Sequence, residues 1–326
     1  MRIVDMVSTI GTVTELISSC RDGVRKDKMS QMDGKINFKL NQTFLKWWER
    51  NSCEFSALLF DIDGTLISGK KAMPGVPSLI KKLEADGFPF YLLTNDGNHS
   101  TREKSNTLHK AGLDIKSDEI ISCGDALKPF AKERGLAGKK FFVMGDLGKP
   151  NYAEKAGLKI EKRTKNINEC AGVIVGEGTY NWQSNISSAM NYFIKYPDRL
   201  LIVPNPDSYW PNGPGGELGI GAGGKARFIC TILGDYGIKL KPIYLGKPYS
   251  AIFNYAFAIL KTRFGLPSNL PRKRVLMLGD SLASDIRGAN RFGFTSGLVL
   301  TGITNHVHLK KAKPGFRPAH IFHSIN

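Results

Sequence analysis

Short apolar runs alternate with helical patterns over most of the chain. Each run is followed by a polar or glycine-containing turn, which is typical of strands buried on both faces of a sheet. Between two such runs, Val76, Leu79, Ile80 and Leu83 have the i, i+3, i+4, i+7 spacing of a helix that Gly87 can end. The runs predict strands at residues 56–60, 90–94, 139–144, 171–175, 199–203, 241–245, 274–278 and 296–300.

Strands that alternate with helices predict an α/β fold with a doubly wound, mostly parallel, Rossmann-like sheet. Ser100 and Glu103 form a capping box that opens a further helix. In sheets of this kind, ligands bind beyond the carboxyl ends of the strands. The reactive residues are therefore expected at those ends.

The first 54 residues have a different pattern. Residues 3–17 carry isoleucine and valine at roughly helical spacing, and residues 44–48 predict a second short helix. We interpret residues 1–54 as an N-terminal extension used for packing or dimerisation. A membrane-surface helix is the weaker interpretation, because the segment lacks a dense face of Lys and Arg.

Composition narrows the class of protein. The 326 residues include 41% hydrophobic and 10% aromatic residues, which supply a core and exclude wholesale disorder. A net charge of +17 favours anionic partners such as phosphate esters, acidic lipids or nucleic acid. The basic segment 306–317 lacks the interleaved aromatics of single-strand binders, so we expect no nucleic-acid partner.

Cysteine usage and hydropathy bear on location. The five cysteines form no Cys-x-x-Cys pair, which indicates a reduced compartment. No apolar run is long enough to span a membrane, and the start of the chain carries acidic residues that a secretory signal would lack. We expect a soluble, cytoplasmic protein with no membrane partner. The interpretation of the N-terminal extension as a dimerisation segment leaves a homo-oligomer open.

Carboxylates gather at two predicted strand ends. Asp61 and Asp63 follow residues 56–60 directly, Asp280 follows residues 274–278, and Asp285 lies in the next turn. At alternate positions of extended chain, Asp61 and Asp63 point to the same side and can face one reacting group. Helix capping explains Asp285 alone well, but it is a weak explanation for four aspartates at two strand ends.

Four segments resemble, in order, the four motifs of the haloacid dehalogenase superfamily of phosphohydrolases: DIDGT, Thr94-Asn95, Gly246-Lys247-Pro248 and GDSLASD. The resemblance covers roughly residues 55–305. It implies that Asp61 is the nucleophile and that Asp63 is the general acid and base. It also implies that phosphate is bound by Thr94, Asn95 and Lys247. Magnesium would be bound by Asp61, Asp280 and the backbone carbonyl of Asp63, with Asp285 behind these ligands.

The chemistry requires these residue types. A carboxylate that attacks phosphorus forms an acyl phosphate, which water can then hydrolyse. At about 4 Å, a carboxylate and a phosphate dianion repel each other by roughly 8 kcal/mol at an effective dielectric constant of 20, so the site needs positive charge. Mg²⁺ and Lys247 can supply it. Related ion-pumping ATPases have Thr at the position of Asp63, so Asp63 favours hydrolysis.

Two other glycine-containing patterns resemble functional motifs but are not assigned a function. Gly-Lys-Pro occurs both at Lys149 and at Lys247, but only Lys247 lies one strand-helix unit before Asp280. We therefore assign the phosphate anchor to Lys247 and a surface role to Lys149. The Gly-x-Gly-x-x-Gly pattern at residues 219–224 does not directly follow a strand, so we interpret it as part of a loop rather than a dinucleotide site.

Motif spacing predicts an inserted domain. Between Thr94 and Lys247 the chain has about a hundred residues more than one core unit needs. We expect an α/β cap at residues 136–240 within a core formed by residues 55–135 and 241–326. Its position resembles the class IIA cap of the superfamily, as does the Asn-Pro-Asp segment at residues 205–207.

Residues after that segment are candidates for substrate recognition. Asp207, Tyr209 and Trp210 would meet the leaving group if their loop faces the core. Stacking of Tyr209 and Trp210 on a flat substrate and packing of Trp210 inside the cap are both open at this point. Two departures from the family pattern are Asp96, which places an acid near the phosphate site, and Glu177, which follows a cap strand where relatives commonly have Asp.

The sequence thus predicts a Mg²⁺-dependent phosphatase of a small organic phosphomonoester that uses an aspartyl-phosphate intermediate. A phosphotransferase or mutase is the enzymatic alternative. A catalytically weak binding protein that keeps the fold is the alternative from another class.

Overall fold

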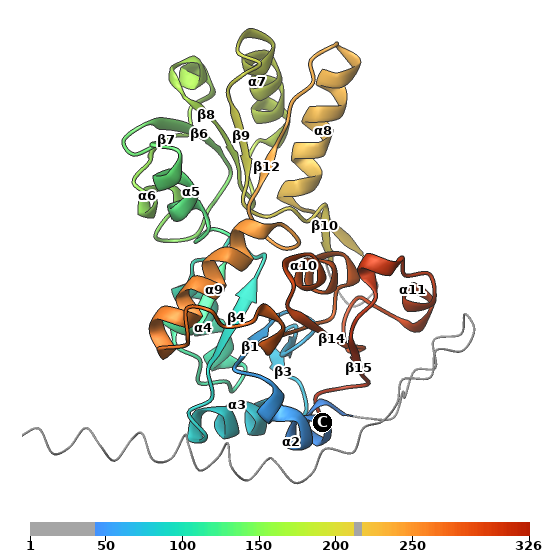
Figure 1. Cartoon of the computed structure of the whole chain (residues 1–326). Helices are drawn as coiled ribbons and strands as arrows, with labels where there is room; N and C mark the ends of the chain where they lie inside the picture. Colours follow the sequence, from blue (N-terminus) through green and yellow to red (C-terminus); the bar gives the residue numbers. More distant parts are fainter. Residues whose placement is uncertain (1–42, 212–216) are drawn as a thin grey trace, which may run out of the picture.

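The computed structural model describes residues 43–211 and 217–326. These residues form two lobes, each built around its own parallel sheet (Figure 1). The lower lobe in this view is the core and the upper lobe is the cap. The predicted α/β architecture with an inserted cap is confirmed by these two sheets. The N-terminal pattern at residues 3–17 lies outside the described residues.

The core sheet has six parallel strands in the spatial order β15-β14-β13-β1-β4-β5. They are β1 (Ala57–Phe60), β4 (Phe90–Thr94), β5 (Ile120–Ser122), β13 (Val275–Gly279), β14 (Thr295–Val299) and β15 (His320–Phe322). Alternate residues of β1 enter the hydrophobic clusters on the two faces of the sheet, which explains its wholly apolar sequence. β1 pairs with β13 along its whole length, with Phe60 opposite Leu278, so their carboxyl ends lie side by side.

Helices cover both faces of the core sheet (Figure 1). They are α2 (Phe44–Asn51), α3 (Val76–Ala85), α4 (Thr101–Lys110), α9 (Ser250–Phe264), α10 (Arg287–Phe292) and α11 (His306–Lys310). The helix α5 (Leu127–Glu133) instead lies beside α6 in the upper lobe (Figure 1). The predicted apolar stripe of α3 is buried. The predicted capping box opens α4. In the part of the chain that the structure describes, no helix is long and apolar enough to cross a membrane.

The cap sheet has five parallel strands in the order β12-β9-β8-β6-β7. The cap elements are β6 (Lys140–Met144), α6 (Tyr152–Lys155), β7 (Lys159–Glu161), β8 (Gly172–Val175), α7 (Trp182–Lys195), β9 (Leu200–Val203), α8 (Ala222–Asp235) and β12 (Ile243–Tyr244). One face of this sheet packs under α7 and α8. Val143 and Ile174 on the other face join a hydrophobic cluster that also contains Leu59 and Leu93 of the core, so the two lobes share a buried interface.

Two antiparallel hairpins complete the fold. β2 (Ile67–Ser68) pairs with β3 (Lys71–Ala72) close to the end of β1. β10 (Tyr209–Pro211) pairs with β11 (Leu218–Ile220) and extends from the cap toward α10 and α11 of the core (Figure 1).

The cap boundary differs from the predicted one at its C-terminal side. Residues 241–245 were expected to begin the second half of the core, but Ile243 and Tyr244 pair with β9 of the cap. The backbone N–H of Leu245 also donates to Val203. The cap sheet therefore extends to Tyr244, because the segment before Lys247 completes its edge.

The N-terminal boundary also differs. Phe44, Trp47 and Trp48 of α2 are buried and belong to the cluster on one face of the core sheet. Phe44 packs edge to face against Phe60 and Phe322. Its backbone N–H donates to Ser324 near the end of the chain. The core therefore includes α2, and the predicted extension ends before it rather than at residue 54.

This packing predicts a sharp difference between two truncations. Loss of a buried Phe or Trp side chain costs about 3–5 kcal/mol, and a whole domain has only about 5–15 kcal/mol of stability. Deleting residues 1–50 removes three such side chains that deletion of residues 1–42 keeps. Urea titration should find the longer deletion largely unfolded where the shorter one is folded. Equal urea midpoints would show that α2 is dispensable.

Candidate active site

The predicted strand ends meet at one edge of the core sheet. Asp61 follows β1, Thr94 ends β4 and Asp280 follows β13. β1 lies between β4 and β13 in the sheet, so these three residues converge. Lys247 enters from the loop after β12. All four side chains are buried.

Lys247 is the central cation of this site. Its Nζ lies 2.5 Å from Asp61 Oδ1 and 2.8 Å from Asp285 Oδ1, and it donates to the carbonyl oxygen of Leu93 at 2.7 Å. Burial alone would lower the pKa of Lys247, but the charges of Asp285 and Asp61 raise it well above its usual range. The lysine is therefore a fixed positive charge. Lys149 of the other Gly-Lys-Pro segment is exposed and away from this site.

Three carboxylates lie beside the lysine. Asp61, Asp280 and Asp285 each offer an oxygen within 4.8 Å of the others. Burial, strengthened by Asp285 and Asp280, raises the pKa of Asp61 well above its usual range, although Lys247 opposes this. Burial followed by the charge of Asp285 raises the pKa of Asp280 to about 7. Such a concentration of buried negative charge is typical of a cation site.

The free oxygens indicate which carboxylates fit a metal. Both oxygens of Asp285 are engaged, one by Lys247 and one by the backbone N–H of Ser281. Asp61 and Asp280 each have one oxygen that no other described residue engages. Mg²⁺ prefers one or two carboxylates completed by waters and phosphate oxygens, so Asp61 and Asp280 fit it. Asp285 lies behind them and holds Lys247.

Close backbone packing fixes Asp280. A Cβ added to Gly302 would lie 1.8 Å from Asp280 Oδ2, and one added to Gly64 would lie 2.4 Å from it. Gly64 also has a φ of +85°, which other residues rarely adopt. The N–H of Ile303 donates to the same oxygen at 2.7 Å. Glycine at these two positions therefore lets the backbone enclose the carboxylate.

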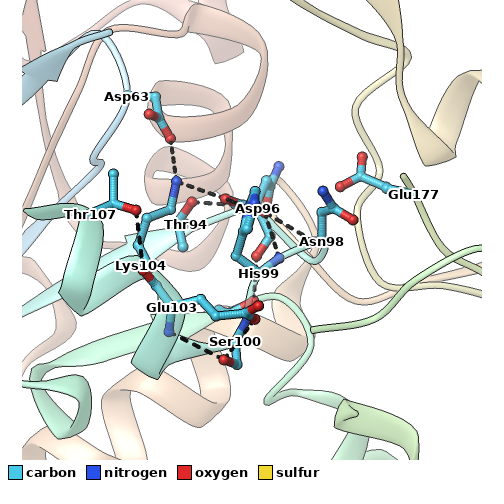
Figure 2. Close-up of polar contacts among 12 residues, drawn as sticks. Asp63, Thr94, Asp96, Asn98, His99, Ser100, Glu103, Lys104, Thr107 and Glu177 are labelled. Atoms are coloured by element: carbon cyan, nitrogen blue, oxygen red, sulfur yellow. Dashed lines mark hydrogen bonds and ion pairs between the residues drawn. The ribbon is translucent and has the colours of Figure 1, made fainter. Parts of the chain in front are cut away.

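Asp63 has different surroundings from Asp61. Its side chain is 61% exposed, and its Oδ2 pairs with Lys104 Nζ of α4 at 3.1 Å (Figure 2). The Asp63 carboxylate is not among the three clustered carboxylates. The expected metal contact of Asp63 is through its backbone carbonyl, which leaves the carboxylate available for proton transfer.

The segment after β4 holds the Lys247 loop. Thr94 Oγ1 accepts from the backbone N–H of Asp96 at 3.0 Å. Asn95 Oδ1 accepts from Lys247 N at 2.7 Å, and its Nδ2 donates to the Lys247 carbonyl at 2.9 Å. The same Nδ2 donates to Asp207 of the cap at 3.0 Å. These bonds occupy the Asn95 side chain, so the predicted phosphate contact of Asn95 would have to use its backbone.

Lys104 is the residue near the site that sequence reasoning missed. Its Nζ lies 2.7 Å from Asp96 Oδ2 in addition to its contact with Asp63. Burial would raise the pKa of Asp96, but the His99 hydrogen bond and the Lys104 charge lower it well below its usual range. The available signal was position: Lys104 lies on the same buried face of α4 as Leu108, where a lysine is unusual.

The cap residues lie in two environments. Asp207 contacts Asn95, and burial raises its pKa. Tyr209 and Trp210 on β10 are about half exposed, at 54% and 48%. The Trp210 indole covers Gly219 across the hairpin, where an added Cβ would lie 2.3 Å from the ring. The alternative that Trp210 packs inside the cap is therefore wrong.

Glu177 follows β8 and faces the core loop at Asn98 in Figure 2. Its Oε1 accepts from Asn205 Nδ2 at 2.8 Å. Burial and then the charge of Asp96 raise the pKa of Glu177 to about 6. Glu177 thus holds the segment that carries Asp207, since the Asp207 N–H donates to Asn205 Oδ1.

Comparison with known proteins agrees with this geometry. Residues 58–159 match the haloacid dehalogenase-like hydrolase family, and residues 244–326 match the HAD-hydrolase-like family. The ribonucleotide monophosphatase NagD of Escherichia coli (strain K12) is 27% identical over 269 residues, covering 82% of this chain and 96% of that protein.

Solved structures share the two-lobed fold. A possible sugar phosphatase from Cytophaga hutchinsonii has a TM-score of 0.73 and 28% identity, covering 89% of this chain and 99% of that one. A glycerol phosphate phosphatase from Mycobacterium tuberculosis in complex with magnesium has a TM-score of 0.69 at 23% identity, covering 83% and 75%.

Fold, motif residues and family matches define a capped phosphohydrolase. The chain belongs to the haloacid dehalogenase superfamily. Within that superfamily it is a phosphoric monoester hydrolase with a class IIA cap, and its relatives are phosphatases of small phosphate substrates.

Proposed function

We propose that this hydrolase is a Mg²⁺-dependent phosphatase that cleaves small organic phosphomonoesters through an aspartyl-phosphate at Asp61. The observation that carries the proposal is the buried contact of 2.5 Å between Lys247 Nζ and Asp61 Oδ1 at the carboxyl end of β1. A carboxylate beside a fixed cation can approach a phosphate dianion that would otherwise repel it.

The metal ligands follow from the donor set. The free oxygens of Asp61 and Asp280, with the backbone carbonyl of Asp63, would hold Mg²⁺. Bound there, the ion would neutralise phosphate charge and keep the two reactants together. Lys247 supplies the second positive charge, and Asp285 keeps the lysine in place.

The reaction then has two steps. The Asp61 oxygen that is not a metal ligand attacks phosphorus as the bond to the leaving oxygen breaks, and Asp63 gives its proton to the leaving oxygen. A water molecule next attacks phosphorus, gives its proton to Asp63 and breaks the bond to Asp61. The Asp63 side chain is 61% exposed, which supports its access to both the leaving group and the water.

The cap supports recognition of the leaving group. Tyr209 and Trp210 present half-exposed rings on a hairpin that extends toward the core. Exposed aromatic rings favour a flat leaving group, because stacking adds about 0.5–1.5 kcal/mol beyond burial. The named substrates of the relatives include ribonucleotides, which are flat, and glycerol phosphate, which is not.

The test is phosphate release from a panel of monoesters with Mg²⁺ and with EDTA. The panel should contain an aryl phosphate, glycerol phosphate, a sugar phosphate, nucleoside monophosphates and pyridoxal phosphate. We expect release that EDTA abolishes and excess Mg²⁺ restores, with faster turnover of the flat esters. No release from any ester would reject the proposed function, and equal rates would remove Tyr209 and Trp210 from recognition.

A further inference from the structure

Lys104 lies between two carboxylates beside the reacting groups. Its Nζ is 3.1 Å from Asp63 Oδ2 and 2.7 Å from Asp96 Oδ2, and the residue is only 8% exposed (Figure 2). The arrangement parallels that of Lys247 between Asp61 and Asp285. Each aspartate of the DIDGT segment thus has its own buried lysine.

The start of α4 fixes where Lys104 lies. Ser100 and Glu103 cap the helix reciprocally. Ser100 Oγ also donates to the carbonyl of Lys149, and Glu103 accepts from the Lys149 N–H. Both of these backbone groups belong to Lys149 of the cap, so the first turn of α4, which lies in the core, is also bonded to the cap. The backbone position of Lys104, which follows Glu103 directly, is therefore fixed relative to Asp63.

Asp96 is the anchor for the lysine. Its Oδ1 accepts from the backbone N–H groups of Asn98 and His99, and His99 Nδ1 lies 2.9 Å from its Oδ2. With these bonds the carboxylate has one orientation. The side chain of Asp96, which departs from the family pattern, therefore has a structural partner in Lys104 and does not point at the phosphate site unpaired.

We propose that Lys104, anchored by Asp96, is a positioning residue that orients the carboxylate of Asp63 for proton transfer. The proposal rests on the proposed function. Asp63 is largely exposed, and Lys104 is its one ion-pair partner among the described residues. Without the lysine, a short exposed side chain would sample several rotamers, and fewer molecules would have Asp63 aimed at the leaving oxygen or the water.

A kinetic comparison of variants tests this role. Lys104→Met should lower kcat for glycerol phosphate about tenfold while KM changes less than about twofold, since the lysine does not hold the phosphate. Lys104→Arg should recover most of the rate, because it keeps a cation at the same position. Lys110→Met is the matched control, since Lys110 is an exposed lysine of the same helix, and it should match the wild type.

A double-mutant cycle separates positioning from other roles. In the Asp63→Asn background, Lys104→Met should cause no further loss of kcat, because the group it orients is already absent. Full additivity would show that Lys104 acts independently of Asp63 and would overturn the proposal. A rise in KM with unchanged kcat would also overturn it and would make Lys104 a phosphate ligand. A lower melting temperature with equal losses for Met and Arg would make it purely structural.

Wild-type turnover separates this inference from the proposed function. If the wild type releases no phosphate from any ester, the proposed function is wrong and the positioning role falls with it. If the wild type turns over and Lys104→Met has the same kcat, only the positioning role is wrong.

Discussion

Asp61→Asn should lower kcat by at least about a thousandfold while the protein stays folded. The amide has the shape of the carboxylate but lacks the charge that attacks phosphorus. Its carbonyl oxygen can still accept from Lys247 Nζ, so the contact seen at Asp61 Oδ1 can persist. Phosphate release under saturating substrate and Mg²⁺ measures the effect.

Two readouts make the Asp61 result interpretable. Circular dichroism and a urea midpoint near that of the wild type would exclude unfolding as the cause. Asp63→Asn gives a graded comparison, because loss of acid-base help typically costs 10²- to 10⁴-fold. A rate for Asp61→Asn within tenfold of the wild type would reject Asp61 as the nucleophile.

Among the single substitutions, Lys247→Met should have the largest effect on the stability of the metal-free protein. The lysine is 1% exposed and neutralises Asp61 and Asp285. Removing one partner of a buried ion pair typically costs about 3–5 kcal/mol, because the remaining charge is left uncompensated. Urea titration without metal measures the loss. Lys149→Met is the matched control from the second Gly-Lys-Pro segment, and its urea midpoint should be unchanged.

The deficit of Lys247→Met should depend on pH in a definite direction. Burial raises the pKa of Asp61, and Lys247 opposes that rise. The pKa of Asp61 should therefore be still higher in the Lys247→Met variant. A carboxyl group whose pKa is raised in the folded state makes a contribution to folding stability that is fully present below its unfolded pKa of about 3.9. That contribution is lost as pH rises through the folded-state pKa. The variant should therefore lie closer to the wild type at pH 5 than at pH 8. A deficit that grows toward pH 5 would contradict the assignment.

The core and the motif residues could be predicted from sequence because each depends on local pattern. The residues at 275–278 are all apolar and are followed by Gly279 and Asp280, and the structure has β13 and a buried Asp280 there. The choice of Lys247 over Lys149 needed only the spacing to Asp280, and the structure buries Lys247 and exposes Lys149.

What could not be predicted depends on long-range packing. α2 has a helical pattern, but nothing local shows that Phe44 packs against Phe322 at the other end of the chain. The strand at Ile243 is two residues long, and only its register with β9 assigns it to the cap. Nothing in the local sequence distinguishes Lys104 from the other lysines of a polar helix, and only the fold brings it into contact with Asp63.

The most direct measurement is identification of the phosphorylated residue. Rapid acid quench of the wild-type enzyme during turnover, followed by borohydride reduction of the acyl phosphate and peptide mass spectrometry, locates the covalent intermediate. We expect modification of Asp61 only when substrate and Mg²⁺ are both present, and none in Asp61→Asn. Steady turnover with modification at another residue, or with none at Asp61, would contradict it.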